Sequence, residues 1–245
     1  PKQYVMDATA RWMDPNGDGD PSDGIDGWRL DVTEDVPVGF WEDWNAHVRD
    51  LNPNAYTTSE IWGNASEFIE EGGFSSTMNY HGLAVPVKAY LIDGGISASR
   101  FVQMLNTRRA HHSTPTQYAM LNLVASHDTP RLASMVVNRN PADTSKEQFG
   151  YDRDVSPRHE STYSVEKPSA KARKIQQLVG LFQMTYIGAP MLYYGTEAGM
   201  WGADDPDDRK PMVWKEYSYE VEEEHPLGQS RAPDTVAFHQ GLFRF

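Results

Sequence analysis

The chain has 245 residues and contains no cysteine, and its 22 Lys and Arg against 35 Asp and Glu give a net charge of −13. This acidic balance argues against nucleic acid or an anionic membrane surface as a partner, because both demand basic patches. The missing cysteines exclude disulfides and thiolate metal sites, and no apolar run approaches the roughly 20 residues of a membrane span. The length suffices for one large globular domain, of a cytoplasmic or an exported bacterial protein.

Apolar spacing and turn residues predict an alternation of helices and strands. The first part is expected to contain a helix over 3–13, an acidic Gly-rich loop over 14–24, a strand ending at Asp31, a helix over 38–51, a strand ending at Glu60, a short helix over 65–71 and a weak strand over 74–78. Such alternation is typical of an α/β fold with a parallel sheet and crossover helices.

The second part continues this pattern. It is expected to contain helices over 83–92 and 97–109 with Ser97 as N-cap, a strand ending at Asp128, a short helix over 129–137 with Pro130 in its first turn, a polar segment over 138–168, a helix over 171–187, a strand over 189–194 and a Gly- and Asp-rich loop over 195–214. In (β/α)₈ barrels the active site lies at the carboxyl ends of the strands.

Three β-prone runs end in an acid, at Asp31, Glu60 and Asp128. Side chains alternate along a strand, so Arg29 and Asp31 point the same way. A charged pair facing inward is unfavourable unless it serves a site. Strand-end carboxylates of this kind are what glycoside hydrolysis requires.

Each of these residues has a simpler interpretation when taken alone. A single Asp after a strand is usually a helix cap or turn former. Arg29 and Asp31 could form a structural ion pair, and His127 could be a satisfied polar residue. The occurrence of all three acids, in order and on successive strands, favours the catalytic interpretation.

Three motifs, at 26–32 (DGWRLDV), 59–62 (SEIW) and 126–129 (SHDT), resemble those of the α-amylase superfamily of glycoside hydrolases. The resemblance is strongest to its neopullulanase, cyclomaltodextrinase and maltogenic-amylase branch, and the order matches the family's strands four, five and seven. The segment 190–197 (PMLYYGTE) looks like strand eight. The resemblance implies a partial (β/α)₈ TIM barrel covering about strands four to eight.

The family's first motif, Asp-x-x-x-Asn-His, is absent. We therefore interpret residues 1–245 as part of a single catalytic barrel domain, truncated at both ends. Open sheet edges would favour self-association, and we expect the isolated chain to be inactive or nearly so.

The resemblance implies a role for each motif residue. Asp31 would be the nucleophile and Glu60 the general acid and base, while Asp128 would bind hydroxyls of the distorted sugar ring with a hydrogen bond from His127. Arg29 is placed to keep Asp31 ionised, because a nearby cation lowers the pKa of an acid. Desolvation by the residues that follow Glu60 would favour its protonated form.

Two further groups are expected to contact sugar. Trp62 could stack on the acceptor sugar, although a core indole is nearly as plausible. Asp205 and Arg209 resemble the family's Asp-Pro-x-x-Arg loop, which contacts donor-side glucose; the alternative is a surface ion pair.

Asp14, Asn16, Asp18 and Asp20 offer oxygen ligands at alternate positions, like the start of a calcium loop. An EF-hand would require Glu at the twelfth position, where the chain has Ile25, so this is not an EF-hand. Calcium fits better than a transition metal because every candidate ligand is a hard oxygen. A Gly-rich turn without an ion is an equal alternative, and no cofactor is required.

The predicted activity is retaining hydrolysis of α-1,4 bonds, with α-1,6 bonds as a second candidate linkage, in maltodextrins, cyclodextrins or starch-like glucans. An α-glucan is the predicted partner. Two alternatives stay open: a glucanotransferase or isomerase of the same superfamily, and a glucan-binding protein without turnover.

Overall fold

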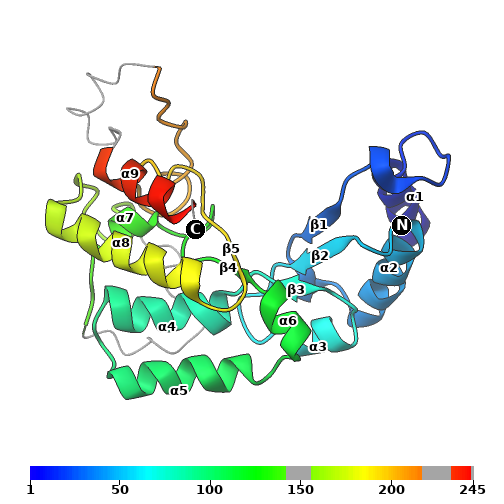
Figure 1. The fold of residues 1–245 in the computed structure, drawn as a ribbon, viewed down its shortest axis with the longest axis horizontal. Helices are drawn as coiled ribbons and strands as arrows, with labels where there is room; N and C mark the ends of the chain where they lie inside the picture. Colours follow the sequence, from blue (N-terminus) through cyan, green and yellow to red (C-terminus); the bar gives the residue numbers. More distant parts are fainter. Residues whose placement is uncertain (142–155, 217–232, 244–245) are drawn as a thin grey trace. The chain divides into compact units, whose positions relative to one another are not determined.

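The computed structural model describes residues 1–141, 156–216 and 233–243 (Figure 1). The chain divides into two compact units, one comprising 1–79 and 111–121 and the other 80–110 and 122–245. In the described part, no helix is both long and apolar enough to cross a membrane. The prediction of a single barrel domain stays a prediction.

The first unit is an α/β arrangement. Its elements are α1 (Lys2–Met13), η1 (Pro21–Asp23), β1 (Gly27–Leu30), η2 (Thr33–Asp35), α2 (Val38–Leu51), β2 (Tyr56–Ser59), α3 (Ser66–Glu70), β3 (Ser76–Thr77) and α6 (Thr114–Ala119). The second unit is largely helical. Its elements are η3 (Tyr80–Ala84), α4 (Val85–Val87), η4 (Lys88–Ile92), α5 (Ala98–Arg109), α7 (Leu132–Met135), α8 (Ala170–Thr185), β5 (Ala189–Pro190) and α9 (Pro233–Leu242), and β4 (Leu121–Asn122) spans the boundary.

The sheet of the first unit is parallel, as the alternating pattern predicts. β2 lies between β1 and β3, and the register pairs Leu30 with Ser59 and Ser59 with Thr77. Gly27 is required where β1 meets β2, because an added Cβ would lie 2.0 Å from the Tyr56 carbonyl oxygen. Parallel strands end at the same edge of a sheet, so the residues that follow β1 and β2 come together there.

An aromatic core joins α1 and α2 to this sheet. Trp41 and Trp44 are buried and pack edge-on at 5.8 Å between ring centroids, and Trp41 also packs on Phe74. Each indole donates one hydrogen bond at 2.9 Å: Trp44 to the Thr9 hydroxyl of α1, and Trp41 to the Thr33 carbonyl. The second bond ties the core to the turn after β1, next to the strand-end acids.

In the second unit, α8 fastens the short strands. Ser169 caps the helix by accepting from the Ala172 N–H at 3.3 Å. The buried Gln183 amide donates to the carbonyls of Asn122 at 2.9 Å and Met191 at 2.6 Å. The Met191 N–H donates to the same Asn122 oxygen. The Gln183 side chain therefore reinforces a backbone contact between β4 and the residue that follows β5.

The helix expected over 83–92 begins earlier and has an unusual form. It starts with the π-helix η3 at Tyr80 and ends with a second π-helix, η4, while only the three residues of α4 between them are α-helical. The buried Lys88 forms an ion pair at 2.7 Å with Asp93 at the end of this segment. Single π-turns occur frequently at functional sites.

Several element boundaries were predicted wrongly. The helix expected over 129–137 is only α7, and Pro130 precedes it, because the Arg131 N–H donates to the Gly202 carbonyl instead of joining a helix. The strand expected over 189–194 ends at Pro190, because side chains bond the Met191 and Tyr194 carbonyls. Helices α6 and α9 were not predicted. Of the polar segment over 138–168, residues 142–155 lie outside the described residues.

Candidate active site

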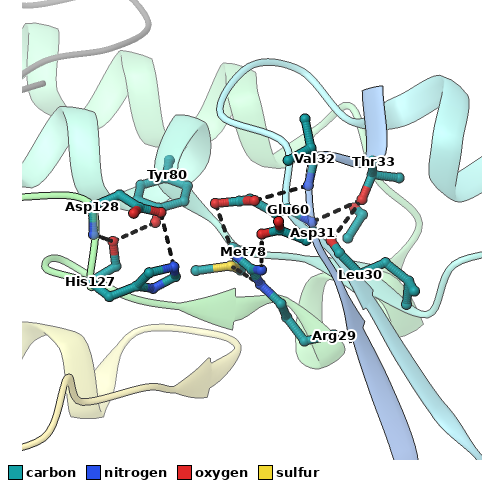
Figure 2. A network of polar contacts seen from close by, with 12 residues as sticks. Arg29, Leu30, Asp31, Val32, Thr33, Glu60, Met78, Tyr80, His127 and Asp128 are labelled. Carbon is teal, nitrogen blue, oxygen red and sulfur yellow. Dashed lines mark hydrogen bonds and ion pairs between the residues drawn. The ribbon is translucent and has the colours of Figure 1, made fainter. Parts of the chain in front are cut away.

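The first unit places two carboxylates at one edge of its sheet. Asp31 directly follows β1 and Glu60 directly follows β2. The Glu60 N–H donates to the Leu30 carbonyl at 2.9 Å, so the parallel ladder continues up to the acid itself. Figure 2 shows both carboxylates beside the Arg29 guanidinium.

Arg29 contacts both acids at once. It projects to the same side of β1 as Asp31, as the spacing of two residues predicts, and its Nη1 pairs with Asp31 Oδ1. Its Nη2 lies 2.8 Å from Glu60 Oε1, and its Nε donates to the sulfur of Met78 at 3.4 Å. A planar guanidinium can serve two carboxylates in fixed directions. One cation therefore orients both acids.

The backbone after β1 holds the other oxygen of Glu60. The Val32 N–H donates to Glu60 Oε2 at 3.0 Å. Val32 adopts the left-handed conformation, with φ 45° and ψ 44°, which is unfavourable for a β-branched residue. The Thr33 hydroxyl donates to the Leu30 carbonyl at 2.9 Å and accepts from the Glu60 N–H at 3.2 Å. Together these contacts hold both the backbone and the side chain of Glu60.

The two acids have different electrostatic surroundings. The Glu60 side chain is 7% exposed, whereas the Asp31 side chain is 69% exposed. Burial raises the pKa of the Glu60 carboxyl, and this effect prevails although the Val32 N–H and Arg29 lower the pKa. A hydrogen bond and the charge of Asp31 raise it further. The expectation that desolvation favours protonated Glu60 is confirmed in direction.

Such a pair can do acid–base and nucleophilic work. When one carboxyl is buried and protonated while its neighbour is solvated and ionised, the first can give a proton as the second attacks. Asp31, paired with a guanidinium, has the surroundings of the ionised partner. Glu60 has those of the proton donor.

The second unit holds the third predicted acid in a different way. Asp128 Oδ2 lies 3.1 Å from His127 Nε2, and its Oδ1 lies 2.9 Å from Arg209 Nη2. Arg209 Nε also donates to the His127 carbonyl and contacts Asp205 Oδ1, both at 2.9 Å. The structure thus brings together four of the residues predicted to contact sugar.

Buried hydroxyls hold the backbone at Asp128. The Tyr80 hydroxyl donates to the Ser126 hydroxyl at 2.7 Å, and the Ser126 oxygen accepts from the Asp128 N–H at 3.1 Å. Tyr80 and Ser126 are fully buried, and Ser126 N–H also donates to Thr129 at 2.9 Å. Figure 2 shows Tyr80, the first residue of η3, beside Asp128.

Trp62 is buried, with only 7% of its surface exposed. This burial matches the alternative interpretation of a core indole. Stacking on an acceptor sugar stays a prediction.

The acidic loop near the N-terminus uses its own oxygens. Asp14 accepts from the N–H groups of Gly17 at 2.8 Å and Gly19 at 2.9 Å. Asn16, Asp18 and Asp20 each accept from the N–H two residues further on. Among the residues that the structure describes, the candidate carboxylates Asp14, Asp18 and Asp20 do not gather their ligand atoms within 4.8 Å of one another. These contacts are compatible with a Gly-rich turn without an ion, and calcium binding stays a prediction.

Sequence reasoning missed the groups that position the acids. The Val32 N–H, the Thr33 hydroxyl and the Met78 sulfur gave no signal, because backbone direction and contacts across strands cannot be read from spacing. Tyr80 gave none, because its partner lies 46 residues away.

Comparison with protein-family models gave no match. Individual proteins do match. Neopullulanase 2 of Thermoactinomyces vulgaris is 35% identical over 215 residues, which are 88% of this chain and 30% of that protein. A cyclomaltodextrinase of a Bacillus species is 30% identical over 243 residues, 99% of this chain and 34% of that protein. The chain thus spans about a third of the length of these relatives.

Solved structures of the same kind of enzyme also resemble this chain. A cyclomaltodextrinase superposes with a TM-score of 0.72 at 29% identity, over 99% of this chain and 33% of that one. The cyclic α-maltosyl-(1→6)-maltose hydrolase of Arthrobacter globiformis, in complex with that sugar, superposes with a TM-score of 0.70 at 25% identity, over 100% of this chain and 43% of that one.

These neighbours are α-amylase-family enzymes with (β/α)₈ barrels. The chain is therefore homologous to about a third of the length of enzymes of the α-amylase family of glycoside hydrolases. Within that class its homologues are named neopullulanase, cyclomaltodextrinase and maltogenic amylase, the branch to which its motifs point.

Proposed function

We propose that the protein carrying this chain is a retaining α-glucan hydrolase. The single observation that carries the proposal is the Arg29-bridged pair of Asp31 and Glu60 at the carboxyl ends of adjacent parallel strands. Retaining enzymes require two carboxyl groups about 5–5.5 Å apart, one to attack the sugar and one to protonate the leaving group. Adjacent strands, about 4.8 Å apart, suit that separation.

The reaction has two steps in this proposal. An oxygen of Asp31 forms a bond to the anomeric carbon while the bond to the glycosidic oxygen breaks, and that oxygen takes the Glu60 proton. Glu60 then removes a proton from water, whose oxygen bonds to the anomeric carbon and releases Asp31. Asp128 and His127, by their likeness to the family motif, bind hydroxyls of the reacting sugar.

The substrates we infer are maltodextrins, cyclodextrins or pullulan. Relatives named for pullulan and for cyclic maltodextrins support this class, and a neighbouring structure holds a cyclic maltosyl sugar. We also infer that residues 1–245 correspond to about strands four to eight of the barrel. The parallel order of β1 and β2 and the position of the motifs support this assignment.

The test is turnover by the protein expressed with all the sequence that flanks this chain in its gene. We expect release of reducing ends from maltotriose and γ-cyclodextrin, with the α-anomer as the first product seen by NMR. A fluorinated glucosyl fluoride should trap a covalent sugar on the peptide that contains Asp31, detected by mass spectrometry.

Other outcomes would contradict the proposal. Transfer products without a net increase in the number of reducing ends would identify a glucanotransferase. A β-anomer would exclude the retaining mechanism. Binding of maltotriose without turnover or trapping would identify a glucan-binding protein.

A further inference from the structure

Arg131, in the second unit, is a fully buried cation whose side chain hydrogen-bonds to backbone carbonyls. Its exposed fraction is 0%. Its Nε donates to the Asp208 carbonyl and its Nη1 to the Tyr194 carbonyl, each at 2.6 Å, while its backbone N–H donates to Gly202 at 3.0 Å. One residue therefore holds three points along the loop that follows β5.

The surroundings of this guanidinium are unfavourable for a purely structural residue. It lies over the rings of Tyr193 and Tyr194, 4.7 and 4.6 Å from their centroids. Burial lowers the pKa of Arg131 and raises that of the neighbouring Asp208 carboxyl to about 7. Both Asp208 carboxylate oxygens are buried and accept no hydrogen bond from the described residues. Apolar residues would fill such a space at a lower cost in stability.

The position of Arg131 in the chain gives this arrangement a purpose. Arg131 lies three residues after Asp128, and the carbonyl that it binds belongs to Asp208, which directly precedes Arg209. Arg209 in turn reaches back to Asp128 at 2.9 Å and to the His127 carbonyl at 2.9 Å. Covalent bonds and hydrogen bonds thus form a closed ring through these residues.

We propose that Arg131 is a positioning residue that sets the Arg209 guanidinium on Asp128 and thereby shapes the binding of sugar. This inference rests on the proposed function. The fork of an arginine is needed because it binds two carbonyls in fixed directions, whereas a lysine offers one point charge on a flexible stem. Without both bonds, the backbone that carries Arg209 is free to move away from Asp128.

The test is a double-mutant cycle in the full-length protein, with maltotriose hydrolysis as the readout. Arg209→Ala is expected to raise KM about tenfold and to lower kcat less, because it removes a sugar contact. Arg131→Lys is expected to raise KM about three- to tenfold in the same way. The double variant should be no worse than Arg209→Ala alone, because both changes remove one arrangement.

A merely structural role predicts a different pattern. In that case the two effects on KM would multiply in the double variant, or Arg131→Lys would lower the melting temperature with KM unchanged. Either result would overturn the inference. Arg173→Lys is the matched control: Arg173 on α8 is also largely buried and lies 5.9 Å from the Trp201 ring, and its guanidinium donates to Gln176. Its KM should not change.

Circular dichroism and thermal unfolding will show whether each variant folds. If Arg131→Lys does not fold, Tyr194→Leu is the second test: it keeps the arginine and removes one ring beneath it, together with the Tyr194 hydroxyl bond to the Lys210 carbonyl. We expect a KM increase of about two- to fivefold, again absent in the Arg209→Ala background. No change in KM would contradict the proposal.

The experiments distinguish a wrong proposed function from a wrong role of Arg131. If the wild-type protein does not hydrolyse or transfer glucans, the proposed function is wrong. If the wild type is active and Arg209→Ala raises KM while Arg131→Lys and Tyr194→Leu do not, only the role of Arg131 is wrong.

Discussion

The acids of the two units are held by different means. In the first unit, Asp31 and Glu60 follow paired strands, and the backbone ladder runs up to Glu60. In the second, the strand expected to reach Asp128 ends at Asn122, and Asp128 depends on side chains: the nearby Ser126 hydroxyl, which the distant Tyr80 supports, and the distant Arg209 guanidinium. In the first unit, backbone pairing sets the position of the two acids and Arg29 orients their side chains, whereas in the second unit a side-chain network holds the acid.

The largest loss of activity is expected from a change in the pair of Asp31 and Glu60. Asp31→Asn removes the proposed nucleophile but preserves its shape, so we expect kcat to fall by about 10⁴-fold or more with the fold unchanged. Initial rates on maltotriose measure this loss. Asp43→Asn, which affects only a surface pair with Lys2, is the control and should be neutral. Retention of a tenth of the activity in Asp31→Asn would rule out this residue as the nucleophile.

Removal of the cation between the pair should be next in size. Arg29→Met is expected to lower kcat/KM by about 10²-fold, because both carboxylates lose their orientation. Arg29 lowers the pKa of Glu60, so its removal raises that pKa further. Glu60 then stays protonated to higher pH, and the alkaline limb of the kcat/KM profile should shift upward.

The control for the pH shift is Arg49→Met. Arg49 lies in the same unit and donates to the Gly73 carbonyl at 2.6 Å, so it should leave the profile in place. An alkaline limb that moves downward in Arg29→Met would contradict the assignment of Glu60 as the proton donor.

A smaller effect is expected in the side-chain network. Tyr80→Phe removes one hydroxyl and leaves the ring, so Ser126 loses a donor while the core stays filled. A lost hydrogen bond of this kind is worth about 1 kcal/mol, or roughly a fivefold decrease in kcat/KM. Tyr118→Phe, on a ring that is 66% exposed, should change nothing. Equal rates for the two variants would show that the network does not position Asp128.

The smallest effect is expected at the acidic loop. Its side-chain oxygens accept backbone N–H groups, so the turn has hydrogen bonds of its own that hold its shape without an ion. We expect EDTA to change the melting temperature by less than about 1 °C. A larger decrease, reversed by calcium and absent in Asp14→Ala, would show that the loop is an ion site.

The same contrast explains which features the sequence could predict. Strand alternation and motif order located Asp31 and Glu60, because parallel pairing converts a position in the chain into a position in space. α2 was predicted with its observed bounds, since its amphipathic pattern ends at Asn52-Pro53.

The wrong predictions fall where contacts from side chains far away in the sequence, rather than backbone pairing between strands, determine the structure. Residues 129–137 have a helical composition, but Arg131 and its partners in the loop after β5 leave only four residues helical. The π-turns at Tyr80 and Lys88 have no periodic signal of their own. The ring through Arg209, Asp128 and Arg131 joins segments about 80 residues apart in the chain, which no local pattern reveals.

Val32 shows how the site and the fold can oppose each other at one residue. Its left-handed backbone is unfavourable by about 1–2 kcal/mol for a branched side chain that is 47% exposed. Glycine would relieve that strain for a smaller loss of chain entropy, yet a looser turn would no longer hold the amide on Glu60. The Val32→Gly variant should therefore have a higher melting temperature and a lower kcat. Selection for thermal stability alone would thus favour a change that impairs this site.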